Sequence, residues 1–139
     1  MTEPTAVDYG MRTHLDLPYE KAIDVVTAAL KTEGFGVLTQ IDVKTTLKQK
    51  LDVEFRRYII LGACNPPLAH RAFMAELEIG LLLPCNVIVY EDDQGDGSVV
   101  YIVDPVAMLG VGLNPSLSAI GEEASARLRR VLAALEMTA

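Results

Sequence analysis

Two cysteines stand in similar settings and carry the side chains best suited to chemistry. Cys64 closes an apolar run and Cys85 opens another, and an asparagine follows each of them, Asn65 and Asn86. If a helix begins after Cys64, its unpaired N–H groups and its dipole would lower the pKa of that thiol. His70 would lie on the first turn of such a helix. Three kinds of site follow: a redox-active thiol pair, a thiolate nucleophile, or a soft-metal site for copper or zinc.

A purely structural interpretation of both cysteines stays open. Free cysteine usually behaves as a small buried apolar side chain, and the spacing of Cys64, His70 and Cys85 matches no zinc finger or ribbon. We therefore predict no cofactor and keep zinc or copper as an alternative. The candidate catalytic or metal-binding residues are Cys64, Cys85 and His70, and the candidate ligand-binding residues are Cys64, Asn65, Cys85 and Asn86.

The elements around the cysteines must bring them to one edge of a sheet. Runs of apolar and β-branched residues predict strands over 7–15, 35–41, 57–64, 85–91 and 98–103. Apolar residues at helical spacing predict helices over 18–34, 42–51, 68–78 and from 118 onward. Asn65-Pro66-Pro67 is expected to stop the third strand, and the turn over 92–97 joins the last two strands in a hairpin. Antiparallel pairing of 57–64 with 85–91 would place both thiols at the same edge.

The resulting order is β-α-β-α-β-α-β-β-α. Because it ends in a hairpin, it favours an α+β fold with a five-stranded antiparallel or mixed sheet and helices packed on one face. The chain contains no repeat, low-complexity tract or linker. We expect a disordered N-terminus over residues 1–6 and a single domain over residues 7–139.

Composition excludes several functions. With 12 basic and 19 acidic residues the net charge is −7, which argues against general nucleic-acid binding. No apolar run is long enough to span a membrane, and the start of the chain lacks the pattern of a signal peptide. With only two cysteines, we expect a cytoplasmic location and reduced thiols. The mean hydropathy of +0.27 is high for a soluble monomer, so apolar surface is either deeply buried or meets a partner.

Two segments could contact a partner. Residues 42–57 contain five basic and three acidic side chains, a local charge of +2 against −9 for the remainder. Such a segment could attract an anionic ligand, although it is also typical of the solvated face of a helix. The connection over 104–115 is apolar for a loop. It would either plug the protomer's own core or meet another subunit.

Several runs resemble the bacterial and archaeal family called domain of unknown function 302. They are Tyr58–Ala69, Gly80–Val87 and Val103-Asp104-Pro105, with Phe35-Gly36-Val37 and Ile41-Asp42-Val43 in the first half. The resemblance extends over roughly residues 7–136 and implies a fold similar to the TATA-binding-protein-like class, assembled as homodimers. It implies neither DNA binding, since fold does not carry function, nor any catalytic residue, since the family has no established activity. The family's two Cys-Asn elements correspond to Cys64-Asn65 and Cys85-Asn86.

We therefore expect a small cytoplasmic, non-enzymatic binding or interaction protein that forms a homodimer. Any small-molecule ligand would lie near the edge that carries Cys64 and Cys85. The first alternative is a thiol-dependent enzyme or redox protein in which Cys64 reacts, Cys85 resolves the product and His70 acts as base. The second alternative is a soft-metal carrier that binds copper or zinc through its thiolates.

Overall fold

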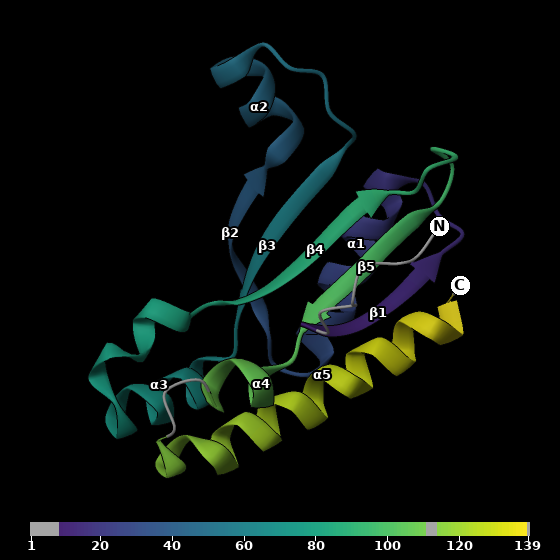
Figure 1. The fold of residues 1–139 in the computed structure, drawn as a ribbon. Helices are drawn as coiled ribbons and strands as arrows, with labels where there is room; N and C mark the ends of the chain where they lie inside the picture. The colour runs from purple at the N-terminus through teal and green to yellow at the C-terminus, as the bar shows by residue number, and fades with distance from the viewer. Residues whose placement is uncertain (1–8, 111–113, 139) are drawn as a thin grey trace, which may run out of the picture.

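Five strands form one antiparallel sheet in the computed structural model, which describes residues 9–110 and 114–138. The spatial order is β1-β5-β4-β3-β2, and all four neighbouring pairs are antiparallel (Figure 1). The predicted α+β fold with an antiparallel sheet is confirmed, and the sheet is not mixed. The strands are β1 Gly10–Leu15, β2 Gly36–Asp42, β3 Tyr58–Cys64, β4 Cys85–Glu91 and β5 Ser98–Val103.

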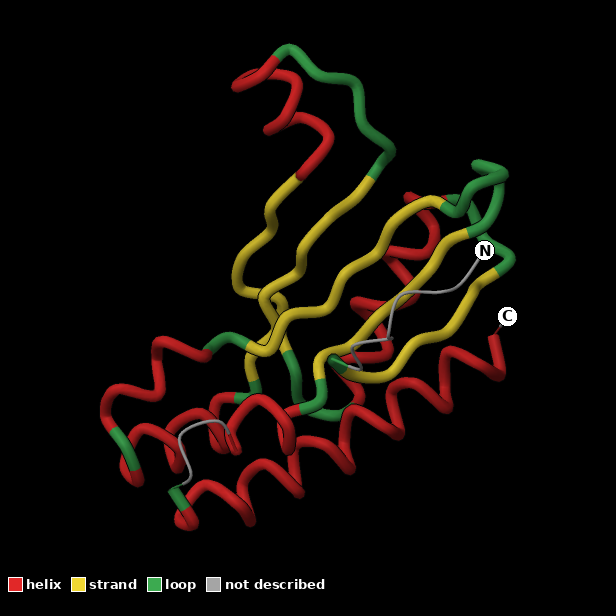
Figure 2. Tube along the Cα trace, in the orientation of Figure 1, coloured by secondary structure: helices red, strands yellow, loops and turns green. Residues whose placement is uncertain are grey.

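Two long helices cover one face of this sheet, while the shorter ones lie beyond the ends of the strands (Figures 1 and 2). Helices α1 and α5 pack on the face, α2 lies beyond one end, and α3, α4 and the 3-10 helix η1 lie beyond the other. Among the described helices, none combines the length and apolar character that crossing a bilayer requires. The bounds are α1 Tyr19–Thr32, α2 Val43–Leu51, α3 Pro66–Ala75, η1 Leu77–Leu82, α4 Pro105–Leu109, η3 Pro115–Leu117 and α5 Ser118–Thr138.

The larger hydrophobic cluster, here called the sheet core, joins the sheet to α1 and α5. Alternate residues of the central strands point to the helices because successive strand side chains face opposite sides. In β3, for example, Ile59, Leu61 and Ala63 are buried. The buried members of the sheet core are Leu15, Ala22, Val26, Leu30, Phe35, Ile59, Leu61, Ala63, Val87, Val89, Val100, Ile102, Leu128, Val131 and Leu135.

A second, smaller cluster, here called the end core, lies beyond the ends of β3 and β4. It is built by α3, η1, α4, η3 and the first half of α5, so α5 runs through both clusters. Its buried members are Leu68, Ala72, Ile79, Leu109, Leu117, Ile120 and Ala124.

The apolar connection over 104–115 is helical in part, where the sequence predicted a loop. The carboxylate of Asp104 accepts a hydrogen bond from Val106 N at 3.0 Å, and Pro105 occupies the first helical position of α4. Leu109 is buried and Met108 packs against the end core. The described part of this segment therefore covers the protomer's own core, while residues 111–113 lie outside the described residues.

Both ends predicted for the helix over 68–78 were wrong, and the start predicted for the first strand lies among residues that are not described. Helix α3 begins at Pro66 and not at residue 68. A proline fits the first helical position because the N–H group that it lacks would have no hydrogen-bond partner within the helix there. Helix α3 ends at Ala75, since Glu76 is extended, and the chain continues as η1. β1 spans Gly10–Leu15. The start predicted for this strand at residue 7 and the disordered segment predicted over 1–6 concern residues that are not described.

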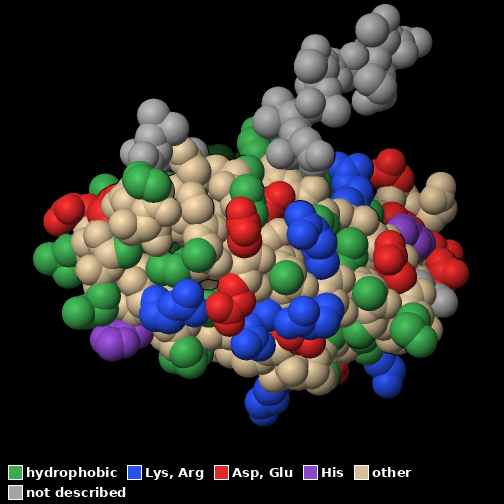
Figure 3. All heavy atoms as spheres, turned by 90° about the horizontal axis from the view of Figure 1, so that it is seen from below, with side chains coloured by type: hydrophobic (Ala, Val, Ile, Leu, Met, Phe, Trp, Pro, Cys, Tyr) green, Lys and Arg blue, Asp and Glu red, His purple; other side chains and the backbone are tan. Residues whose placement is uncertain are grey.

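Ion pairs hold α5 against α1 and α3. Glu33, after the end of α1, pairs with Arg127 and with Arg130, the latter at 2.9 Å. Glu123 pairs with Arg71 of α3 at 2.9 Å and with Arg127 at 3.3 Å. The underside of the molecule accordingly shows basic and acidic side chains interleaved and not gathered into patches of one sign (Figure 3).

Candidate functional site

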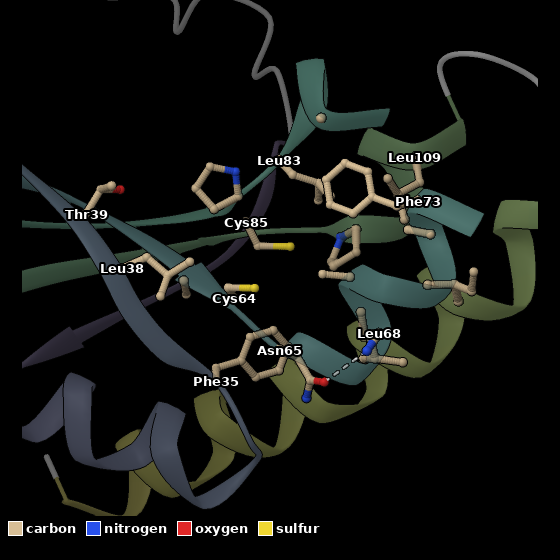
Figure 4. Close-up of a pocket in the computed structure, with 18 residues that line it drawn as sticks. Phe35, Leu38, Thr39, Cys64, Asn65, Leu68, Phe73, Leu83, Cys85 and Leu109 are labelled. Carbon is tan, nitrogen blue, oxygen red and sulfur yellow. Dashed lines mark hydrogen bonds between the residues drawn. The ribbon is translucent and has the colours of Figure 1, made fainter. Parts of the chain in front are cut away.

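An apolar pocket opens between the sheet core and the end core. Its volume is about 270 Å³, and it lies where β3 ends and β4 begins (Figure 4). Phe35, Ala63 and Cys85 line it from the side of the sheet, and Leu68 and Leu109 from the side of the end core. The pocket is therefore the space that the two hydrophobic clusters leave between them.

Both cysteines line this pocket. The antiparallel register of β3 and β4 puts Ala63 opposite Cys85, so Cys64 and Cys85 come to the same end of the sheet. Figure 4 shows the two sulfur atoms directed into the pocket, and no disulfide joins them. The edge that the sequence indicated as a candidate site thus coincides with a cavity.

A β-bulge in β2 places two side chains in the lining of the pocket. The register shifts between Val37 and Thr39, so Leu38 has no partner on β3. A bulge of this kind re-aims side chains, and here both Leu38 and Thr39 line the pocket. Thr39 pairs with Gly62, where any side chain would collide with the Thr39 hydroxyl and the ring of Pro84. The glycine therefore lets β2 and the segment before β4 approach each other at the mouth.

The thiols are held in their neutral form. Burial raises the pKa of Cys64. It raises the pKa of Cys85 to about 11, with a further contribution from the negative charge that an ionised Cys64 would carry. Both cysteines are therefore protonated at neutral pH, and neither has the depressed pKa of a reactive thiolate.

The expectation that the start of α3 would lower the pKa of Cys64 was wrong, and the helix cap gives the reason. Pro66 and Pro67 have no N–H group to offer an anion. The next amide, Leu68 N, donates to Asn65 Oδ1 at 3.2 Å. The N–H groups that would favour a thiolate are thus missing or already used.

Asn65 joins the two halves of the molecule. While its Oδ1 caps α3, its Nδ2 donates to Glu33 O at 3.2 Å. The side chain is 7% exposed. Gly34 passes directly beside the amide with φ +84°, a conformation and a close approach that exclude other residues there. Asn65 lines the pocket, but its amide is bonded at both ends to the protein's own backbone.

The other predicted site residues lie elsewhere. α3 turns Leu68 and Ala72 toward the pocket and leaves His70 exposed, and Asn86 is exposed on β4. The structure thus brings together Cys64, Asn65 and Cys85, but neither His70 nor Asn86. Within residues 9–110 and 114–138, no three His, Cys, Asp or Glu side chains are grouped so that they could hold a metal ion.

Sequence reasoning missed most of the apolar wall, including Phe35, Leu38, Phe73 and Leu83. These residues look like ordinary members of strands and helices. One signal was available, since Leu83 and Pro84 directly precede Cys85 in one of the runs that resemble the family.

Comparisons with known proteins agree with this architecture. Residues 11–135 match the family described as "Domain of unknown function DUF302". The crystal structure of an uncharacterized conserved DUF302 protein from Bacillus stearothermophilus matches with a TM-score of 0.82 and 28% sequence identity, covering 96% of this chain and 100% of that one. No curated protein matches the chain. Since the family match includes every residue of the pocket and nearly the whole chain, as the shared sequence runs predicted, this protein belongs to the DUF302 family.

Proposed function

We propose that this protein is a non-enzymatic binding protein that takes an uncharged, apolar small molecule into the pocket beside Cys64 and Cys85. The observation that carries this proposal is the pocket itself, a cavity of about 270 Å³ without a charged side chain among the described residues that line it. A concave apolar site at the ends of strands is a common setting for small-molecule binding.

The volume indicates the size of the ligand. An engineered apolar cavity of about 150 Å³ binds benzene, and this pocket is nearly twice as large. A linear chain of about eight carbons or a bicyclic ring system would fill such a space. The aromatic rings of Phe35 and Phe73 at opposite walls would contact either kind of molecule.

The polar groups of the pocket favour a neutral ligand. Both thiols are protonated, and the Asn65 amide is bonded to Leu68 N and Glu33 O. A carboxylate or ammonium group inside would therefore lose its hydration without gaining a charged partner, which is strongly unfavourable. Any polar end of the ligand would lie at the mouth, near the Thr39 hydroxyl or in solvent.

The thiol-enzyme alternative receives less support. A cysteine nucleophile needs a lowered pKa or an adjacent base, whereas burial raises the pKa of both thiols and His70 is exposed on α3 outside the pocket lining. The soft-metal alternative would rest on Cys64 and Cys85 alone, because the described residues supply no third His, Cys, Asp or Glu beside them, and burial raises the pKa of both thiols and so disfavours the thiolate form that binds a metal.

The test compares two ligands of equal length and different charge. We expect 1-octanol to bind with one site per chain in calorimetric titration, and octanoate to bind at least about tenfold more weakly because its charge would be desolvated. Octanol should also slow the modification of Cys64 by a chromogenic disulfide. Octanoate binding as tightly as octanol, or octanol without effect on the thiol, would contradict the proposal.

A cavity-filling variant provides the matched control. Ala69 lines the pocket on α3, whereas Ala133 is exposed on α5. Ala69→Phe should abolish octanol binding, and Ala133→Phe should leave it unchanged. Thermal unfolding of both variants checks that each is folded, and undiminished binding by a folded Ala69→Phe protein would place the ligand elsewhere.

A further inference from the structure

The exposure of the pocket lining changes from one end of the pocket to the other. Leu68, Leu109 and Ala124 belong to the end core and are each only 5% exposed. Leu38 and Thr39, both on β2, are exposed. Figure 4 shows the sulfur atoms of the two cysteines between Thr39 on one side and Leu68 and Leu109 on the other. An elongated molecule in the pocket would therefore have one end in the protein interior and the other at the mouth, beside Thr39.

The polar groups of the lining differ in their remaining capacity for hydrogen bonds. The Asn65 amide is already bonded to Leu68 N and Glu33 O, and thiols are weak hydrogen-bonding groups. In contrast, no residue within 9–110 and 114–138 is hydrogen-bonded to the Thr39 hydroxyl. A hydroxyl group can donate one hydrogen bond and accept two. Thr39 is therefore the lining residue best able to bind a polar atom of a ligand.

The backbone sets the direction of this hydroxyl. The bulge in β2 places Thr39 opposite Gly62 of β3, and a side chain on Gly62 would collide with Thr39 Oγ1 and with the ring of Pro84. The hydroxyl thus lies over β3 and close to the residue that precedes Cys85. Figure 4 shows its oxygen on the side of Thr39 that is nearer to Cys85. The hydroxyl is therefore directed toward the pocket, although the residue itself is exposed.

The buried end of the pocket favours the opposite kind of group. Its described side chains, those of Leu68, Leu109 and Ala124, are apolar. A hydroxyl or carbonyl group placed there would lose its hydrogen bonds to water without replacing them, which is unfavourable. An apolar tail in the same place would gain about fourfold in affinity for each buried CH₂ group. The two ends of the pocket thus select different ends of a ligand.

We propose that the ligand is a neutral amphiphile, bound with a hydroxyl or carbonyl oxygen at Thr39 and with its apolar tail directed toward Ala124 of α5. This inference rests on the proposed function and adds the class and the orientation of the ligand. Thr39 would recognise the polar head, and Ala124 would limit the length of the tail.

The first experiment tests the direction of the tail with primary alcohols from 1-butanol to 1-decanol, titrated calorimetrically into the full chain. In the wild-type protein, each added CH₂ group should tighten binding about fourfold up to about 1-octanol. Ala124→Leu fills the buried end, so the gain should stop near 1-pentanol. Ala119→Leu, at an exposed position of the same helix, should leave the series unchanged.

A smaller substitution keeps this test independent of folding. Thermal unfolding checks that Ala124→Leu is folded, and Ala124→Val provides the same comparison if it is not, with the gain expected to stop near 1-hexanol. Weakening of every alcohol by the same factor in a folded variant would show that the tail does not run toward α5, and it would overturn the inference.

The second experiment tests the head with two ligands of equal length, 1-octanol and 1-fluorooctane, of which only the alcohol is a good hydrogen-bonding partner. Binding of each is measured through the protection of Cys64 from a chromogenic disulfide. Thr39→Val removes the hydroxyl at similar volume, so it should weaken 1-octanol binding about fivefold and leave 1-fluorooctane binding unchanged. Thr45→Val, exposed on α2 and outside the pocket lining, should change neither.

The outcomes separate this inference from the proposed function. A wild-type protein that binds no 1-octanol would contradict both. A wild-type protein that binds 1-octanol, combined with equal effects of Thr39→Val on the two ligands, would leave the pocket as a binding site and overturn the inference alone.

Discussion

The sheet core and the end core are built from the same kinds of side chain but differ in size and in the secondary structure that surrounds them. Among the described residues, the sheet core has fifteen buried members, held by a ladder of four strand pairs and covered by two long helices. The end core has seven buried members in the same described part of the chain, contributed by short helical segments and the first half of α5. The smaller cluster does not reach the ends of the strands, and the pocket occupies the gap. The cavity thus lies beyond the end of the β-sheet, where short helices fixed by side-chain caps position the chain.

The largest expected effect distinguishes the two clusters directly. Leu61 is fully buried in the sheet core, whereas Leu68 is 5% exposed in the end core and lines the pocket. Leu61→Ala should lower the free energy of unfolding by about 4 kcal/mol and Leu68→Ala by about 2 kcal/mol, because one side of Leu68 already faces a cavity and loses fewer contacts. Denaturant unfolding measures both. Equal losses would show that the end core is as tightly packed as the sheet core.

A smaller effect tests the connection between the clusters. Asn65→Ala removes the cap of α3 and the bond to Glu33 O, and should cost about 2 kcal/mol of unfolding free energy. Asn114 is the matched cap, since its Oδ1 accepts from Ser116 N at 3.0 Å and its Nδ2 donates to Glu76 Oε1 at 3.0 Å, but it begins only the short helix η3. Asn114→Ala should cost less than about 1 kcal/mol.

The variant Asn65→Asp divides the two roles of this residue. It keeps the oxygen that caps α3 and loses the donor to Glu33 O. We expect its free energy of unfolding to lie between those of the wild-type protein and Asn65→Ala. Wild-type stability in Asn65→Asp would show that the bond to Glu33 contributes nothing to the link between the clusters.

The smallest expected effect is a pH dependence at the border of the pocket. Burial raises the pKa of Cys85 to about 11, above its ordinary value of 9.0. Below pH 9 both the folded and unfolded chains hold the proton. Between about pH 9 and pH 11 only the folded chain holds it, so stability must fall as pH rises, by about 1 kcal/mol at pH 10.

Other buried groups also have raised pKa values and would lower the stability as pH rises, so the contribution of Cys85 must be measured with a variant that lacks its thiol. Burial also raises the pKa of Cys64, of Tyr58 and, to about 12, of Tyr19. Urea unfolding between about pH 8 and pH 10 should therefore show a shallower loss of stability in Cys85→Ala than in the wild-type protein. Parallel curves would mean that Cys85 is solvated in the folded state and that the pocket wall is open at this point.

Local patterns in the sequence predicted the strands and the long helices well. The apolar and β-branched runs in 57–64 and 98–103, the turn over 92–97 and the apolar stripe of the last helix each depend on residues close in the chain. The short elements α4 and η1 were missed because five or six residues do not establish a helical period. Their stability comes from the end core, to which distant segments contribute.

The sequence by itself determined the order of the elements and favoured an antiparallel or mixed sheet, in which pairing of 57–64 with 85–91 would bring Cys64 and Cys85 to one edge. That these strands do pair, and that every pair in the sheet is antiparallel, depends on contacts between segments distant in the chain. Only the tertiary structure decided that this edge is an apolar pocket with neutral thiols. That outcome depends on burial and on Pro66, Pro67 and Asn65 removing the N–H groups that would have stabilised a thiolate. The desolvation of a thiol depends on all the residues that surround it in the folded protein, and the spacing of residues along the chain does not specify those surroundings.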